Sequence, residues 1–268
     1  MADDTTDRSL PPIYADDSPD IREAVQRRYT AVAERGSCCG PAASSCCDSD
    51  TAAGRLYSAE ELAAITDEAA AAAAGCGNPT AFAELRPGET VLDLGSGGGI
   101  DCFLAAKQVG PEGRVIGIDM TVAMVDLARQ NAAKLEAHNV VFKLAQIEAL
   151  PEPDGTVDAI ISNCVVNLAP DKQQVFNEAF RVLAPGGRLY VSDIVLTREL
   201  PPEVAGDWDQ WAGCIAGAQL KDVYLGEIKE AGFTDIDVIS DVPAAIGSGD
   251  GSPGAVRSIS VRAVKPAG

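Results

Sequence analysis

Hydrophobic and polar residues follow two periods from residue 90 onward. Short β-branched, apolar runs predict strands, and the segments between them carry apolar residues at helical spacing. We predict strands at 90–94 (TVLDL), 114–119 (RVIGID), 140–146 (VVFKLAQ), 157–168 (VDAIISNCVVNL) and 188–195 (RLYVSDIV). We predict helices at 101–109, 122–135 and 172–183. Strands that alternate with helices favour an α/β fold with a doubly wound, mostly parallel sheet.

The C-terminal part of the chain changes this rhythm. Residues 199–222 form a mostly helical, Trp-bearing insertion, after which GEIKEAGF at 226–233 resumes the helical pattern. The two alternating runs at 235–242 (DIDVISDV) and 257–264 (RSISVRAV) predict an antiparallel strand pair that closes the sheet. The Gly/Ser/Pro-rich stretch at 247–254 links them.

The N-terminal part is helical and rich in cysteine. Residues 1–18 are polar and acidic and predict a disordered tail. A helix begins at Pro19 and ends at Gly36, and residues 36–54 form a loop with two vicinal cysteine pairs. Residues 58–73 predict one helix opened by a capping box, which GCGNP at 75–79 ends. The domains are thus a tail at 1–18, an arm at 19–88 and a main domain at 89–268.

Charge and composition narrow the function. The chain has 21 basic and 40 acidic residues, a net charge of −19, which argues against nucleic-acid and anionic-membrane binding. No apolar run reaches the roughly 20 residues of a spanning helix, and the start lacks the pattern of a signal peptide. We therefore expect a cytoplasmic protein with reduced thiols. The lone histidine, His138, is expected in a solvated loop.

A glycine loop follows the first predicted strand of the main domain. DLGSGGG at 93–99 fits D-x-G-x-G-x-G, and Ile100 takes the place of the third small residue that a dinucleotide-binding loop needs. Glycines at such a strand–helix junction let a ligand approach the backbone and the helix N-terminus. Asp119 ends the next strand, where a carboxylate accepts the ribose hydroxyls of an adenosine ligand. This combination favours S-adenosylmethionine over NAD, with Asp93 holding its ammonium group.

The arrangement resembles the Rossmann-like class I S-adenosylmethionine-dependent methyltransferases over about residues 89–197. That resemblance implies that Gln146 and Ile147 lie beside the adenine and that Asn163 lines the cofactor site. Many members have an acid at the Gln146 position. The full set of cofactor-binding candidates is Asp93, Gly95, Ser96, Gly97, Gly99, Asp119, Met120, Gln146, Ile147 and Asn163.

Three of the eight cysteines indicate the acceptor. Cys76 lies between two glycines, Cys164 follows the fourth strand at the sheet edge where ligands bind, and Cys214 lies in the insertion. Three converging thiolates suit a soft, thiophilic centre such as trivalent arsenic. Its lone pair, which points away from the sulfurs, can attack a sulfonium methyl group. Cys102, on the helix after the glycine loop, is expected to be a buried packing residue.

The chain also resembles the arsenite S-adenosylmethionine methyltransferases. GCGNP, ISNCVVNLAPDK, FRVLAPGGRL and AGCIAGA carry this resemblance over roughly residues 56–235. It implies that Cys76, Cys164 and Cys214 bind arsenic and that either Cys46 or Cys47 pairs with Cys76 during turnover. Cys38 and Cys39 are candidates for accessory arsenic sites. Arsenite or its thiol conjugates would be the substrate, and glutathione or thioredoxin the reductant.

Two other functions remain open from the sequence. The chain could methylate a carbon or oxygen of an organic small molecule, which would need a nearby base and would tolerate loss of the cysteines. It could instead sequester arsenite through its thiols without turnover. Loss of methylation on replacing Cys164, with cofactor binding retained, separates the arsenic reaction from both.

Overall fold

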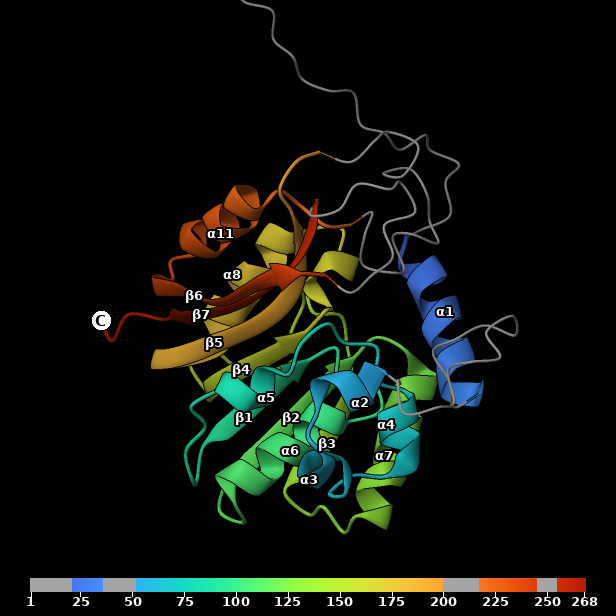
Figure 1. The fold of residues 1–268 in the computed structure, drawn as a ribbon. Coiled ribbons are helices and arrows are strands. Elements are labelled where there is room, and N and C mark those ends of the chain that lie inside the picture. Colours follow the sequence, from blue (N-terminus) through green and yellow to red (C-terminus); the bar gives the residue numbers. More distant parts are fainter. Residues whose placement is uncertain (1–20, 36–51, 200–216, 245–254) are drawn as a thin grey trace, which may run out of the picture.

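The computed structural model describes residues 21–35, 52–199, 217–244 and 255–268 (Figure 1). Its centre is a seven-stranded sheet in the order β3-β2-β1-β4-β5-β7-β6. The strands are β1 (Thr90–Leu94), β2 (Arg114–Asp119), β3 (Val140–Leu144), β4 (Val157–Asn163), β5 (Leu183–Leu196), β6 (Thr234–Pro243) and β7 (Val256–Val264). The first five strands pair in parallel, whereas β7 is antiparallel to both β5 and β6. The predicted α/β fold, with its closing antiparallel pair, is confirmed.

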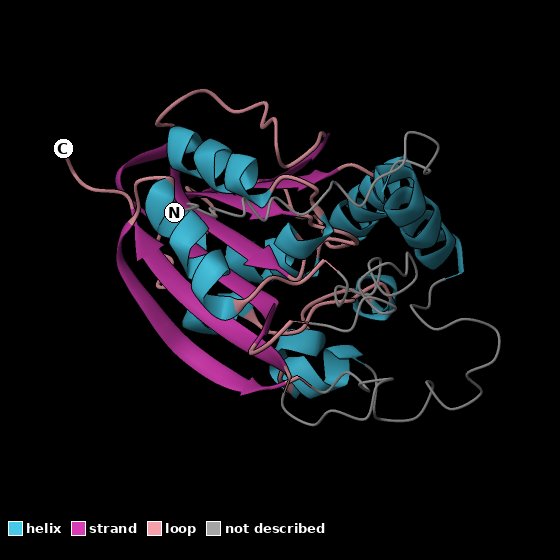
Figure 2. Cartoon of the chain, turned by 90° about the horizontal axis from the view of Figure 1, so that it is seen from above, coloured by secondary structure: helices cyan, strands magenta, loops and turns pink. Residues whose placement is uncertain are grey.

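Both faces of the sheet are buried, which explains why its central strands are apolar throughout. In β1, Val91 packs into one core cluster and Leu92 into the other, because successive side chains of a strand point to opposite faces. One face is covered by α8 (Lys172–Val182) and α11 (Lys221–Glu230), as Figure 2 shows from above. The other face is covered by α6 (Ile100–Val109) and α7 (Val122–Lys134).

The N-terminal arm covers one end of this core. Its longest helix, α1 (Ile21–Arg35), lies against α7. The short helices α2 (Ala52–Leu56), α3 (Ala59–Leu62), α4 (Asp67–Ala71) and α5 (Pro79–Phe82) follow. Ala53 and Ala69 are buried in the same cluster as α6, so this part of the arm belongs to the core of the main domain.

Several predicted elements have other bounds in the structure: β3 ends at Leu144 instead of 146, and β5 begins at Leu183 instead of 188. Two further differences have a clear local cause. The single helix expected at 58–73 is wrong: Ser58 does form the capping box with Glu61, but Thr66 caps a second helix by accepting a hydrogen bond from Ala69 N–H. Two competing N-caps therefore divide the alanine-rich segment. The fourth strand ends at Asn163 instead of 168, because Cys164 has a left-handed φ of 59° and the 3₁₀ helix η1 (Val166–Leu168) follows.

Other predictions concern residues outside the described ranges. They include the disordered tail at 1–18, most of the cysteine-rich loop, the body of the insertion at 199–222 and the link at 247–254. Among the helices that are described, none has the length and apolarity needed to cross a membrane.

Candidate active site

An open cleft of about 960 Å³ lies at the carboxyl ends of the central strands. Residues that follow β1, β2 and β4 form its floor, and α1 forms part of its wall through Arg22, Val25 and Tyr29. The helix is held there by an ion pair between Arg22 and Glu148 at 3.1 Å. Gln26 also donates a hydrogen bond to the carbonyl of Met120. The cleft therefore sits where an α/β sheet binds its ligands.

The glycine loop adopts the shape that its sequence predicts. Gly95, Gly97 and Gly99 all have positive φ, and a Cβ on Gly95 would lie 2.3 Å from Cγ2 of Val165. The chain therefore needs glycine at 95 both for its conformation and for the close approach of the β4 edge. Gly99 leads directly into α6, whose first turn faces the cleft through Ile100 and Asp101.

Asp119 is fixed at the rim of the cleft. Its Oδ2 accepts a hydrogen bond of 3.0 Å from Gly97 N–H, and its Oδ1 accepts one of 2.8 Å from Thr121 N–H. Burial raises the pKa of this carboxyl, and the backbone donors oppose the shift. Each oxygen keeps a further lone pair, so Asp119 can accept hydrogen bonds from hydroxyl groups of a ligand.

Asp93 faces the core and does not line the cleft. Its Oδ2 accepts a hydrogen bond of 3.1 Å from the thiol of Cys102, which is fully buried as expected for a packing residue. Burial, reinforced by the nearby Asp101 carboxylate, raises the pKa of Asp93 well above its usual range. The role of Asp93 as the residue that holds the cofactor's ammonium group stays a prediction.

A buried polar triangle, which sequence reasoning missed, lies between the glycine loop and the thiols. The Tyr57 hydroxyl donates to Asp101 Oδ1 at 2.9 Å, and Asn163 Nδ2 donates to Asp101 Oδ2 and to the Tyr57 oxygen, both at 3.1 Å. All three residues line the cleft. Burial raises the pKa of Asp101 to about 6 and that of Tyr57 well above its usual value.

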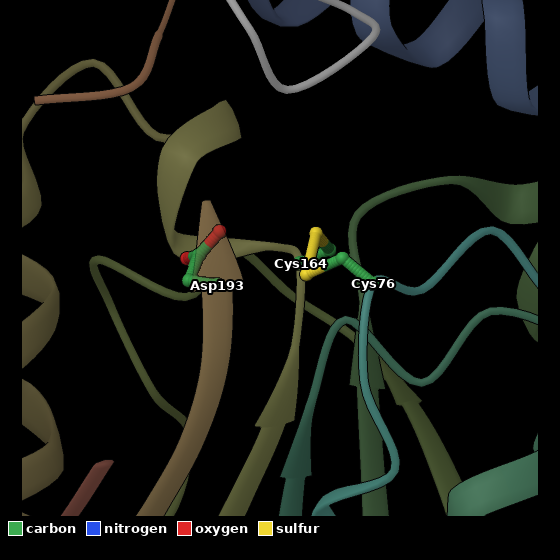
Figure 3. A group of neighbouring side chains, drawn as sticks. All are labelled: Cys76, Cys164 and Asp193. Atoms are coloured by element: carbon green, nitrogen blue, oxygen red, sulfur yellow. A yellow bond between two sulfur atoms is a disulfide. The ribbon is translucent and has the colours of Figure 1, made fainter. Parts of the chain in front are cut away.

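Cys76 and Cys164 meet beside this triangle and form a disulfide, with their Cα atoms 5.8 Å apart (Figure 3). Cys164 follows β4 and lines the cleft, and its N–H donates to the carbonyl of Ser192 at 2.8 Å. Cys76 reaches it from the loop before α5, where the backbone of Gly75 and Gly77 passes close to the sheet. Two residues that are 88 positions apart in sequence thus share one site.

Asp193, on β5, is the third group at this site (Figure 3). One of its oxygens and the two cysteine sulfurs all lie within 4.8 Å of one another. The carboxyl is fully buried and accepts hydrogen bonds from Asn167, Ile194 N–H and the Tyr224 hydroxyl. Burial raises the pKa of Asp193 to about 7. A carboxylate inside an otherwise largely apolar strand was the signal that could have revealed it.

Most of the predicted cofactor-binding residues line the cleft in the structure, and the others lie outside its lining. Those that line the cleft are Gly95, Ser96, Gly97, Asp119, Met120, Ile147 and Asn163, together with Cys164. Gly99 and Cys76 lie behind this surface, and Gln146 is exposed outside it. In this segment of the chain, the acid that lines the cleft is Glu148, two residues beyond Gln146. Cys38, Cys39, Cys46, Cys47 and Cys214 lie outside the described residues.

The floor of the cleft suits an adenosyl ligand that carries positive charge. Ser96 has a buried hydroxyl for which the described part of the chain supplies no hydrogen-bond partner. Asp119 and Asp101 offer carboxylates on either side of the glycine loop. Apolar side chains, Met120 and Ile147, provide a surface for a planar ring.

A family model described as a methyltransferase domain matches residues 85–232, more than half of the chain. The chain therefore belongs to the methyltransferase domain family. The predicted resemblance to this class of methyltransferases is confirmed at the level of the domain family.

The individual relatives are more specific. The chain is 48% identical over 233 residues to an arsenite methyltransferase of Halobacterium salinarum, covering 83% of this chain and 59% of the relative. It is 40% identical over 168 residues to the human arsenite methyltransferase, covering 59% and 44%. The chain thus spans about three fifths or less of the length of these two curated relatives.

Among solved structures, this chain is similar to the arsenic(III) S-adenosylmethionine methyltransferase of Chlamydomonas reinhardtii. It is 34% identical to this chain with a TM-score of 0.66, covering 79% of this chain and 72% of that one. The resemblance to arsenite methyltransferases that the sequence motifs indicate is thereby confirmed.

Proposed function

We propose that the chain transfers methyl groups from S-adenosylmethionine to trivalent arsenic held by cysteine thiolates. The observation that carries this proposal is the meeting of the Cys76 and Cys164 sulfurs at the edge of the cofactor cleft. The names of its relatives support arsenite, or a thiol conjugate of it, as the substrate.

The disulfide must open before arsenic binds. Two thiols of a reductant such as glutathione, or the dithiol of thioredoxin, supply two electrons and two protons, and Cys76 and Cys164 become thiols. Arsenite then exchanges its three hydroxyl groups for three sulfurs, and each exchange releases one water. Cys214 provides the third sulfur in this proposal. Thiolates are the ligands that a soft centre prefers.

S-adenosylmethionine supplies an electrophilic methyl group on its sulfonium sulfur. The glycine loop and Asp119 hold the nucleoside, and Cys164 presents arsenic at the same cleft. The arsenic lone pair forms the new bond to carbon as the carbon–sulfur bond breaks. The nucleophile carries no proton, so no general base is needed and the protein contributes mainly orientation at short range.

Each methyl transfer oxidises arsenic by two electrons, so two thiols must be oxidised to return it to the trivalent state. Arsenic donates its lone pair to the methyl group, and two electrons must return to it before a further methyl transfer. Two cysteine thiols can supply them by forming a disulfide, and in this proposal they are Cys76 and either Cys46 or Cys47.

The test is arsenic speciation after incubation of reduced protein with S-adenosylmethionine, arsenite and glutathione. We expect methylated arsenic from the wild type and none from Cys164→Ser, with S-adenosylmethionine binding retained by calorimetry. Cys102→Ser is the matched control, because it removes a sulfur that lies in the core and keeps a donor for Asp93; it should still methylate. Arsenite bound without any methylated product would favour sequestration instead.

A further inference from the structure

Asp101 stands at the boundary between the cofactor cleft and the thiol site. It lies in the first turn of α6, lines the cleft and is 4% exposed. The hydrogen bonds that its carboxylate accepts from described side chains come from two neutral groups, the Tyr57 hydroxyl and the Asn163 amide. The Glu61 carboxylate adds negative potential nearby. A buried carboxylate in these surroundings favours a cation in the adjoining space.

Asn163 links Asp101 to the loop that holds Cys76, because its side chain forms hydrogen bonds with both. Its Nδ2 donates to Asp101, while its Oδ1 accepts the N–H groups of Cys76 at 3.1 Å and Gly77 at 3.2 Å. Its Nδ2 also donates to the Gly77 carbonyl at 2.7 Å. These bonds go to the backbone of the Cys76 loop, and none of them involves the Cys76 sulfur.

In the structure, the two N–H groups of the Asn163 amide are shared among Asp101, the Tyr57 oxygen and the Gly77 carbonyl. With Asp101 ionised, the carboxylate accepts from Nδ2, and Oδ1 necessarily faces the N–H groups of Cys76 and Gly77. If Asp101 is neutral, it accepts more weakly and the orientation of the amide is less strongly fixed. A cation beside Asp101 favours the ionised form and thereby this orientation.

We propose that Asp101 is a positioning residue that couples the two ligands: the positive charge of the bound cofactor acts on Asp101, and Asn163 transmits the effect to the backbone of the Cys76 loop. The inference rests on the proposed function, since it needs both a cationic cofactor and arsenic at the thiols. It predicts that each ligand binds more tightly when the other is present, by the same factor.

The experiment measures that factor. Arsenite binding to the reduced protein is followed by equilibrium dialysis and arsenic mass spectrometry, with and without saturating sinefungin, a cationic cofactor analogue that has no methyl group to transfer. At pH 5, where Asp101 is largely neutral in the absence of a cation, we expect arsenite to bind the wild type more tightly with sinefungin by a factor of about 5. Calorimetry of sinefungin, with and without arsenite, should return the same factor.

Asp101→Asn should bring this factor close to one, because the variant lacks the charge that responds to the cation. Asp119→Asn is the matched control. It removes a charge from the same cleft, but the Asp119 carboxylate accepts hydrogen bonds from the N–H groups of Gly97 and Thr121 and makes none with Asn163 among the described residues. This variant should bind sinefungin more weakly. At saturating sinefungin, its ratio of arsenite affinities with and without sinefungin should equal that of the wild type.

Equal arsenite affinity with and without sinefungin in the wild type would overturn the inference, even if Asp101→Asn fails to fold. A factor that survives in folded Asp101→Asn would also overturn it. A wild type that methylates arsenic but shows no coupling leaves the proposed function intact, whereas failure of the reduced wild type to bind arsenite contradicts both.

Discussion

The thiol of Cys102 donates a hydrogen bond to Oδ2 of Asp93 at 3.1 Å, beneath the glycine loop. The carboxylate that opens the D-x-G-x-G-x-G pattern is therefore turned toward the core, and Asp101 is the carboxylate that lines the cleft beside the loop. Asp93 therefore supports the glycine loop from the core, whereas Asp101 and Asp119 line the cleft that faces the ligand.

Replacing Cys102 tests whether its hydrogen bond to Asp93 stabilises the folded protein. Cys102→Ala leaves a buried acceptor on Asp93 without its donor, which should cost about 1–3 kcal/mol of unfolding free energy. Cys102→Ser restores a donor and should recover part of the loss. Urea unfolding of the three proteins measures the difference. Equal stability of the alanine and serine variants would show that the hydrogen bond contributes nothing.

The glycine loop offers a comparison between two positions with the same backbone requirement. Gly95 and Gly97 both have positive φ, but only a Cβ at 95 meets Val165; none of the surrounding atoms lies within 4 Å of a Cβ at 97. Each alanine variant should lose about 1–2 kcal/mol for the left-handed conformation, and Gly95→Ala should lose more because of the clash. Thermal unfolding and cofactor calorimetry measure both effects. A Gly97→Ala variant impaired more than Gly95→Ala would contradict the geometry.

Cofactor affinity should increase with pH. Burial raises the pKa of Asp101 to about 6, so this carboxyl is largely neutral at pH 5 and ionised at pH 7. A cation prefers the ionised form, and the raised pKa values of Asp93 and Asp119 act in the same direction. Calorimetry of sinefungin across this range should show tighter binding at the higher pH. Asp101→Asn should flatten the profile; an unchanged slope would assign the dependence to the other carboxyls.

Asp193 should make the folded state less stable as pH rises. Its pKa is about 7 in the folded protein and about 3.9 when unfolded, so between these values the folded state binds more protons. Stability from this group is therefore full below the unfolded value and is lost as pH rises toward 7, by at most about 4 kcal/mol. Asp193→Asn should lose less stability than the wild type between pH 5 and pH 8 in urea unfolding. Identical losses would contradict the raised pKa.

Local patterns predicted the sheet well. The runs that form β1 and β2, the glycine loop and the place of Asp119 all follow from residues that are neighbours in sequence. The alanine-rich segment was harder, because the helical tendency of its residues hides the second N-cap at Thr66. A local pattern does not show which of two compatible helix starts is used.

The contacts that define the site were beyond such patterns. Tyr57 and Asn163 reach Asp101 from 44 and 62 residues away in sequence. An acidic residue in the first turn of a helix is common for reasons of helix polarity alone, so Asp101 carried no distinct signal. The sequence placed Cys76 and Cys164 together as ligands of one soft centre, but it gave no signal that they would be bonded to each other.

The most direct test of methyl transfer to arsenic uses a cofactor whose methyl group carries deuterium. Reduced protein, arsenite and this labelled S-adenosylmethionine are mixed for a single turnover, and the arsenic species are separated and weighed by mass spectrometry. The account predicts methylated arsenic that carries the intact deuterated methyl group, formed by the wild type and absent with Cys164→Ser. Labelled cofactor that is bound and recovered unchanged, with all arsenic still inorganic, would contradict it.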